Sequence, residues 1–136
     1  MLFRSGAIIQ AANHYLKSSQ RASETVKDFK HFRKQETEYL KIFITENKLW
    51  ILDINFEFFI AEGSEQRVFL KDNKNVIKLN DSIFYASWYD YFINLLLNNY
   101  FFPDTAYKLL GFYPNEDNLY AVVEQPFVIS TEPTDL

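Results

Sequence analysis

Apolar positions in the first third of the chain recur at the spacing of an α-helix. In residues 1–48 they fall at intervals of three and four, and they comprise Ile8, Ala12, Tyr15, Leu16, Val26, Phe29, Phe32, Tyr39, Leu40 and Phe43. Charged residues between Glu24 and Lys41 occupy the other surfaces, as expected of an amphipathic helix. Ser23 is the predicted start of a second helix. Asn47 is its predicted end, because asparagine tolerates the left-handed conformation found there.

The period changes from helical to alternating after Trp50. Leu52, Ile54, Phe56, Phe58 and Ile60 alternate with mostly polar residues, which predicts a half-buried strand. Gly63-Ser64-Glu65 interrupts this strand, and residues 67–71 form a second one. The polar turn Asp72-Asn73-Lys74-Asn75 leads into a third strand, residues 76–79. Two successive hairpin connections indicate an antiparallel meander.

A helix and two more strands complete the predicted fold. Asn80-Asp81-Ser82 offers N-caps for the helix, and Pro103 ends it. Its predicted apolar face is Phe84, Trp88, Phe92 and Leu95, and a polar line of Ser87, Asp90, Asn94 and Asn98 follows another side. Strands follow at residues 107–112 and 119–124, joined by a turn at 114–117, and Pro126 leaves the sheet.

The element order predicts an α+β fold. It consists of N-terminal helices, an antiparallel sheet of about five strands and one helix packed on that sheet. We divide the chain into a helical segment, 1–48, packed on a body, 49–136, within a single compact domain, which the length of 136 residues permits.

Composition and charge narrow the functional classes. The absence of cysteine excludes disulfides and thiolate metal sites, and no stretch is apolar enough to span a bilayer, so a cytoplasmic protein is expected. Residues 1–48 hold nine Lys/Arg and five Asp/Glu, whereas residues 49–136 hold five and thirteen. The basic segment could meet an acidic partner, but the acidic body makes nucleic-acid binding the less favoured interpretation.

Residues 61–79 contain the pattern most suggestive of chemistry. A strand, a loop with one glycine, a second strand and a third strand bearing a lysine follow the order seen at the start of a protein-kinase N-lobe. The loop residues Gly63 and Ser64 are candidates for binding phosphate through backbone N–H groups. Val68 is a candidate for covering a nucleotide base, and Lys78 for pairing with phosphate.

Two further residues belong to this hypothesis. Asp90, on the following helix, is the natural carboxylate partner for the Lys78 ammonium, since an unpaired buried charge costs several kcal/mol. Gln125 lies where the last strand leads into the position of a kinase hinge. The alternative that Lys78 has no role in binding stays open: it would then be an exposed strand lysine or part of an ion pair that only stabilises the fold.

The ordered motifs resemble one family. E-G-S-E-Q-R-V-F-L, V-I-K-L-N, F-Y-A-S-W-Y-D-Y-F, F-F-P-D-T-A-Y-K-L-L-G-F and L-Y-A-V-V-E-Q-P-F-V are similar to the kinase-like domain of bacterial polyvalent proteins, over roughly residues 35–136. Those are large multidomain proteins of phages and conjugative elements. The resemblance implies a divergent N-lobe with Gly63, Lys78 and Asp90 on the phosphate side.

The same resemblance leads us to expect more chain after T-E-P-T-D-L, because H-R-D-like and D-F-G-like motifs do not occur in these 136 residues. We therefore expect a non-catalytic module that acts through protein or domain contacts, with weak ATP/Mg binding left open. Two alternatives remain: a fragment of a phosphotransferase whose C-lobe lies elsewhere, and a nucleic-acid-binding accessory protein. Exposed apolar surface on such a lobe predicts a homodimer through the N-terminal helices or the hinge side.

Overall fold

The computed structural model describes residues 7–22, 29–54, 59–62, 66–116 and 118–126. Two helices begin it, α1 (Ala7–Ala22) and α2 (Phe29–Glu46), which confirms the helical prediction for the N-terminal segment. The predicted end of α2 is also confirmed, but the left-handed residue is Lys48, with a φ of 57°. Asn47 instead donates its side-chain amide to the carbonyl oxygen of Phe43, at 2.9 Å.

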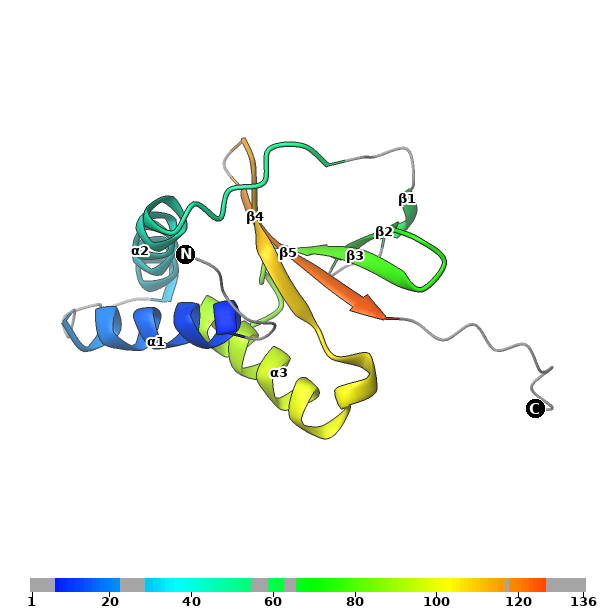
Figure 1. The fold of residues 1–136 in the computed structure, drawn as a ribbon. Coiled ribbons are helices and arrows are strands. Elements are labelled where there is room, and N and C mark those ends of the chain that lie inside the picture. Colours follow the sequence, from blue (N-terminus) through cyan, green and yellow to red (C-terminus); the bar gives the residue numbers. More distant parts are fainter. Residues whose placement is uncertain (1–6, 23–28, 55–58, 63–65, 117, 127–136) are drawn as a thin grey trace.

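The strands form one antiparallel sheet in the order β1-β2-β3-β5-β4 (Figure 1). Their bounds are β1 (Phe59–Glu62), β2 (Gln66–Leu70), β3 (Asn75–Asn80), β4 (Lys108–Asn115) and β5 (Asn118–Pro126). The predicted hairpin between β2 and β3 is confirmed. Asp72 closes it by accepting the backbone N–H groups of Lys74 and Asn75, at 2.7 and 2.8 Å. The α+β class predicted from the sequence is therefore confirmed.

The predicted strand at residues 52–60 is wrong over its first part. Residues 51–54 form no strand, Leu52 is 72% exposed, and residues 55–58 lie outside the described part of the chain. Backbone pairing at the start of this segment goes to β4 instead: Ile51 N–H donates to the Phe112 carbonyl and Phe112 N–H donates to the Leu49 carbonyl, both at 2.8 Å. The chain at residues 49–51 is therefore laid against β4.

Gly111 of β4 makes this close approach possible. A Cβ atom at Gly111 would lie 2.4 Å from the Leu49 carbonyl oxygen, closer than real contacts allow. Any other residue would push residues 49–51 away from the sheet.

The helix after β3 begins later than predicted. α3 spans Trp88–Phe101, and its N-cap is Ser87, whose hydroxyl accepts the N–H of Asp90 at 3.0 Å. The predicted caps at residues 80–82 form a turn, in which the Asn80 carboxamide accepts the N–H of Ser82. Phe84 precedes α3 and is 57% exposed, so it does not belong to the apolar face as predicted.

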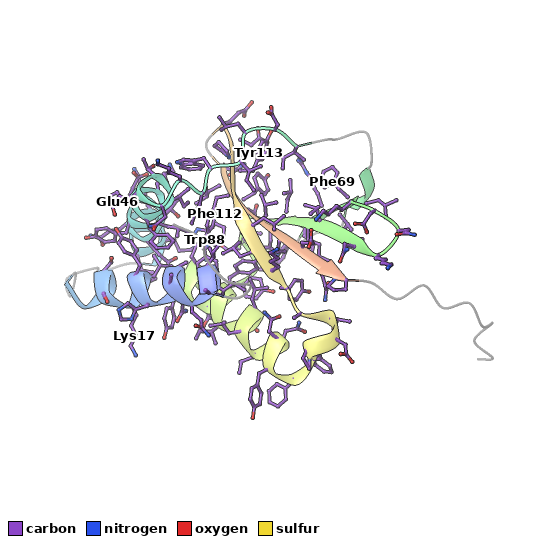
Figure 2. All side chains as sticks on the ribbon, in the orientation of Figure 1. Lys17, Glu46, Phe69, Trp88, Phe112 and Tyr113 are labelled. Carbon is purple, nitrogen blue, oxygen red and sulfur yellow. The ribbon has the colours of Figure 1, made fainter. Side chains whose placement is uncertain are left out.

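The main core lies between the helices and one face of the sheet. α3 contributes its buried residues Trp88, Tyr91, Phe92 and Leu95, and β4 and β5 contribute Leu109, Phe112, Ala121 and Val123. Trp88 and Phe112 pack edge to face, with ring centroids 6.2 Å apart, and Figure 2 shows both between the helices and the sheet. A short 3₁₀ turn, η2 (Pro103–Thr105), joins α3 to β4.

A smaller core occupies the opposite face of the sheet. It is built on Phe69, Leu79 and Val122, against which Ile51, Ile54 and Tyr113 pack. Figure 2 shows Phe69 and Tyr113 on this side. In the described part of the chain, no helix is both long enough and apolar enough to cross a bilayer.

Candidate functional site

The strand register places three predicted or neighbouring site residues side by side. Val68 of β2 is paired with Lys78 of β3, and Lys78 is paired with Val123 of β5. Directly paired residues point to the same face of a sheet. Val123 belongs to the main core, so Val68 and Lys78 also lie on the helix-covered face. A lysine thus lies between two valines across the sheet.

Lys78 is half-buried and contacts an aromatic ring. Its ammonium lies 5.3 Å from the centroid of Tyr107 and 3.5 Å from the Tyr107 hydroxyl oxygen. Among the described residues, no carboxylate lies within ion-pair distance of Lys78. A cation over an aromatic face is favourable, but the ring does not neutralise the charge.

Lys71 offers a useful contrast on the same sheet. It forms an ion pair with the carboxylate of Glu124, and this hydrogen bond raises the pKa of the Lys71 ammonium above its ordinary value. Lys71 is therefore satisfied by a carboxylate within the protein, whereas the contacts of Lys78 are with a neutral phenol.

The structure does not bring Asp90 to Lys78. Asp90 lies exposed in the first turn of α3, where its backbone N–H donates to the N-cap Ser87. Gly63 and Ser64, the two predicted loop residues, lie outside the described residues. The predicted Lys78–Asp90 pair is therefore not formed in this structure.

Gln125 lies on the same sheet face as Lys78, because it pairs with Val76, two residues before Lys78. Its side-chain amide donates to the carbonyl oxygen of Thr105, at 2.9 Å. Gln125 thus ties the end of β5 to the η2 turn that follows α3.

A cavity of about 220 Å³ lies between α3 and the strand ends near Lys78. Strands β2 and β3, the turn before α3, α3 itself and the residue before β4 supply its walls, which are Gln66, Asn80, Tyr85, Tyr91, Asn94, Leu95, Asn98 and Tyr107. We call it the amide pocket, after its four carboxamide side chains. Tyr107 links the pocket to Lys78.

One donor of the amide pocket has no partner. The side-chain nitrogen Nδ2 of Asn98 is buried and makes no hydrogen bond within the part of the chain that the structure describes. Such groups are rare in folded proteins, because each costs about 1–3 kcal/mol of desolvation. The line of Asn94 and Asn98 along the predicted helix was visible in the sequence. Its proximity to Tyr107 was not, because residue 107 belongs to another element.

One phenol in the wall of the amide pocket, that of Tyr91, is buried. Burial raises the pKa of the Tyr91 phenol well above its ordinary value, and the neighbouring phenols of Tyr85 and Tyr107 raise it further. This environment disfavours a negative charge on Tyr91.

Two side chains of α2 fix the position of α3. Both carboxylate oxygens of the buried Glu36 accept backbone N–H groups at the start of α3, from Trp88 at 2.7 Å and from Tyr89 at 3.2 Å. Arg33 donates to the Tyr85 carbonyl at 2.6 Å and to the Ser82 hydroxyl at 2.7 Å. These contacts hold the start of α3, and the turn before it, against α2.

The arrangement offers a cation beside a pocket lined by carboxamide and phenol side chains. It can bind an anionic group at Lys78 and hydrogen-bond a small polar group in the amide pocket. Among the described residues, no three His, Cys, Asp or Glu side chains gather where they could hold a metal ion.

Comparison with known proteins identifies one relationship. The family model described as "Serine/Threonine/Tyrosine Kinase found in polyvalent proteins" matches residues 33–136. The matched range begins at Arg33 and also contains Glu36, so it includes both residues of α2 that hold the start of α3. No curated protein and no solved structure matches the chain.

Proposed function

We propose, from the premise that this chain belongs to the kinase family found in polyvalent proteins, that it is an N-lobe-like module that binds a nucleoside triphosphate through Lys78. The observation that carries the proposal is the register Val68–Lys78–Val123, which sets a lysine between apolar residues on the helix-covered face. Phosphate would supply the negative charge that the phenol of Tyr107 does not.

The order of elements supports the N-lobe interpretation. A meander of β1, β2 and β3 leads to α3, and β4 and β5 follow in the same sheet. In protein kinases a loop between two strands covers the phosphates and the next strand carries the phosphate-pairing lysine. This part of the argument is an analogy of fold, and the placement of Lys78 is what makes it specific.

We further propose that these 136 residues bind nucleotide without transferring its phosphoryl group. Transfer requires metal ions placed against the phosphates and a group that orients the attacking hydroxyl. The printed sequence contains neither an H-R-D-like nor a D-F-G-like motif to supply them. Incubation with γ-labelled ATP and a mixture of protein substrates should leave all label in nucleotide or free phosphate; labelled protein that depends on Lys78 would contradict this part.

Calorimetric titration with ATP and Mg²⁺ tests the binding site directly. We expect Lys78→Ala to weaken binding at least about tenfold, since charge-assisted hydrogen bonds contribute about 1.5–3 kcal/mol. The matched control is Lys74→Ala, because Lys74 is an exposed lysine of the β2–β3 turn and is remote from the pocket. It removes the same charge from the chain.

Thermal unfolding gives an independent readout of the same binding. A ligand at 100 times its Kd stabilises the native state by about 2.7 kcal/mol, so ATP should raise the Tm of the wild type and of Lys74→Ala. Equal affinity of the wild type and Lys78→Ala for ATP would overturn the proposal and leave Lys78 a structural residue.

A second candidate function is association through protein contacts, and exposed aromatic residues favour it. Four large apolar side chains are exposed at the end of α3: Leu97 (51%), Tyr100 (79%), Phe101 (65%) and Phe102 (61%). They adjoin η2, which Gln125 ties to β5, so this α3-end patch lies on the hinge side. Exposed apolar patches commonly mark interaction sites. We propose that a second copy of the chain covers it.

Light scattering over a concentration series tests this association. We expect the wild type to dimerise at high micromolar concentration and Phe101→Glu to remain monomeric. Phe84→Glu is the matched control, since Phe84 is an equally large aromatic that is 57% exposed before the other end of α3. A monomeric wild type, or a Phe84→Glu variant that dissociates as Phe101→Glu does, would contradict the proposed dimer.

A further inference from the structure

We propose that Tyr107 and Asn99 are positioning residues for Lys78: Asn99 fixes Tyr107, and the ring of Tyr107 fixes the Lys78 ammonium. This inference rests on the proposed function, in which Lys78 meets an anionic group. It adds how the lysine is held in place before the anion arrives.

Tyr107 is the partner of the Lys78 ammonium within the described residues. Val68 and Val123, which flank Lys78 across the sheet, offer no polar side-chain atom. The hydrogen bond and the ring contact of Lys78 both go to Tyr107, at 3.5 Å to its hydroxyl oxygen and 5.3 Å to its ring centroid. Because 3.5 Å is the outer limit of a hydrogen bond, the attraction of the cation to the aromatic face is the main contact.

Asn99 of α3 holds the backbone of Tyr107 at two points. Tyr107 lies just before β4, so it is outside the β4–β5 ladder, whose first pair is Lys108 and Glu124. Its N–H and carbonyl groups therefore need partners elsewhere. The Asn99 carboxamide supplies both: Oδ1 accepts the Tyr107 N–H at 2.6 Å, and Nδ2 donates to the Tyr107 carbonyl at 2.8 Å.

This two-point attachment fixes the direction in which Tyr107 projects. Two hydrogen bonds from one planar carboxamide restrain both the position and the orientation of the backbone. The ring is half-buried and packs against the main core. Gln125 holds the preceding part of the same link through the carbonyl oxygen of Thr105, at 2.9 Å. The ring that contacts Lys78 is thus held by α3, by β5 and by the core.

A neutral aromatic partner suits a lysine that binds an anion. A lysine side chain loses rotamer freedom when it is ordered, so one that is ordered beforehand binds with a smaller entropic loss. A carboxylate would also order the side chain, but it would cancel the charge, as Glu124 does for Lys71. Tyr107 holds the ammonium of Lys78 and leaves its positive charge available.

Nuclear magnetic resonance of the ligand-free chain tests the Tyr107 contact. The ε-methylene group of Lys78 is bonded to the nitrogen that lies over the ring, so the ring current should shift its proton signal upfield of that of the exposed Lys74. Lys78→Ala assigns the signal. We expect Tyr107→Phe, which keeps the ring, to retain the shift, and Tyr107→Leu to lose it.

The matched control is Tyr120→Leu. Tyr120 also has a cation over its ring, that of Arg67 at 5.8 Å, but it packs against the smaller core on the other face of the sheet. Its removal should leave the Lys78 signal unchanged. An unchanged Lys78 signal in Tyr107→Leu would overturn the inference.

Calorimetric titration with tripolyphosphate tests whether this contact aids binding. We expect Tyr107→Leu to weaken binding by about three- to tenfold, the range that ordering one such side chain accounts for, and Tyr107→Phe to stay within about twofold of the wild type. Unchanged or tighter binding by Tyr107→Leu would mean that the ring does not prepare Lys78 for an anion, and would overturn the inference.

Asn99→Leu tests the second step. It should reduce both the upfield shift of Lys78 and the affinity for tripolyphosphate. The matched control is Asn94→Leu, which also removes a carboxamide that donates to a carbonyl group, but that carbonyl belongs to Asp90 of the same helix. Since Asn99 acts through Tyr107, Asn99→Leu should weaken binding no further in a chain that already carries Tyr107→Leu. Additive losses would contradict the role of Asn99.

A milder variant guards against misfolding of Asn99→Leu. Asn99→Asp keeps the acceptor for the Tyr107 N–H and removes the donor to the Tyr107 carbonyl, and Asn94→Asp adds the same charge elsewhere on α3. We expect Asn99→Asp to move the Lys78 signal toward its position in Tyr107→Leu while the circular dichroism spectrum stays that of the wild type. A folded Asn99→Asp protein with the wild-type signal and affinity would refute the role of Asn99.

The failure of this inference is distinguishable from the failure of the proposed function. Tripolyphosphate affinity that does not change in Lys78→Ala would overturn the proposed function, and the signal of the ligand-free chain would still decide whether Tyr107 holds Lys78. Binding that depends on Lys78, with the wild-type signal and affinity in Tyr107→Leu, would overturn this inference and retain the phosphate site.

Discussion

The two ends of α3 differ in how completely their polar groups are paired. At the start, the Ser87 hydroxyl and the Glu36 carboxylate accept three backbone N–H groups between them, and Arg33 holds the preceding turn. Toward the other end, the Nδ2 group of Asn98 is buried without a hydrogen-bond partner among the described residues, and Phe101 is 65% exposed. The first end is held by contacts within the protein, and the second leaves groups available for contacts from outside.

This difference separates positioning from recognition. Local rules of polar pairing and burial are obeyed where α3 is anchored, and they are violated next to the amide pocket and in the α3-end patch. Natural proteins concentrate such violations at functional sites. The anchored end is tied to α2, whereas Asn98, near the other end, lines a pocket together with Tyr107, which contacts Lys78.

The largest expected effect comes from breaking the anchored end. Glu36→Ala removes a carboxylate that accepts the N–H groups of Trp88 and Tyr89 and leaves both donors buried. Hydrogen bonds to charged groups contribute about 1.5–3 kcal/mol, and a negative charge at a helix start adds to this. We expect the free energy of unfolding, measured by urea denaturation, to fall by about 2–3 kcal/mol.

The control for this prediction lies two residues along the same helix. Glu38 is exposed and, among the described residues, pairs with Lys41 alone, at 3.5 Å. Glu38→Ala should therefore change the free energy of unfolding by less than about 1 kcal/mol. If the two glutamate variants lost the same stability, the contacts across to α3 would not be what anchors its start.

Periodicity predicted the elements whose residues pair or pack locally. The apolar spacing of α1 and α2, the β2–β3 hairpin and the strands β4 and β5 were all predicted from short windows of sequence. Each depends on neighbours close in the chain, such as Asp72 with Lys74 and Asn75 in the β2–β3 turn. Pattern alone is informative in these cases.

Periodicity failed where distant contacts decided the conformation. Leu52 begins an alternating run, yet it forms no strand, and the residues just before it, 49–51, are laid against β4 beside Gly111. No local pattern records that contact. The start of α3 is set by Ser87 together with Glu36, a residue 52 positions earlier than Trp88. In a sequence, Glu36 looks like one more charged residue on the solvent side of an amphipathic helix.

The candidate site was predicted in part for the same reason. Alternation along β3 predicted that Lys78 and Val76 lie on the same face of the sheet. The hairpin turn between β2 and β3 fixes the register between those two strands. The carboxylate partner assigned to Lys78 was Asp90, but the helix begins at Trp88 and exposes Asp90 in its first turn. Tyr107 was placed in a strand, and its contact with Lys78 arises only when β4 joins the sheet next to β5.

The smallest expected effect is at the other end of α3, where a substitution should raise the free energy of unfolding instead of lowering it. Asn98→Leu replaces a buried, unpaired amide by an apolar side chain of similar size, which removes a desolvation penalty that amounts to about 1–3 kcal/mol for such groups. We expect the free energy of unfolding of the ligand-free protein to rise by about 1 kcal/mol, at the lower end of that range. Asn118→Leu, on the exposed start of β5, should produce no such gain. A loss of stability in Asn98→Leu would mean that its amide is paired in solution, and the two ends of α3 would then be equally satisfied. A gain would show that the protein gives up stability at this residue by keeping a buried donor that nothing within the described chain pairs.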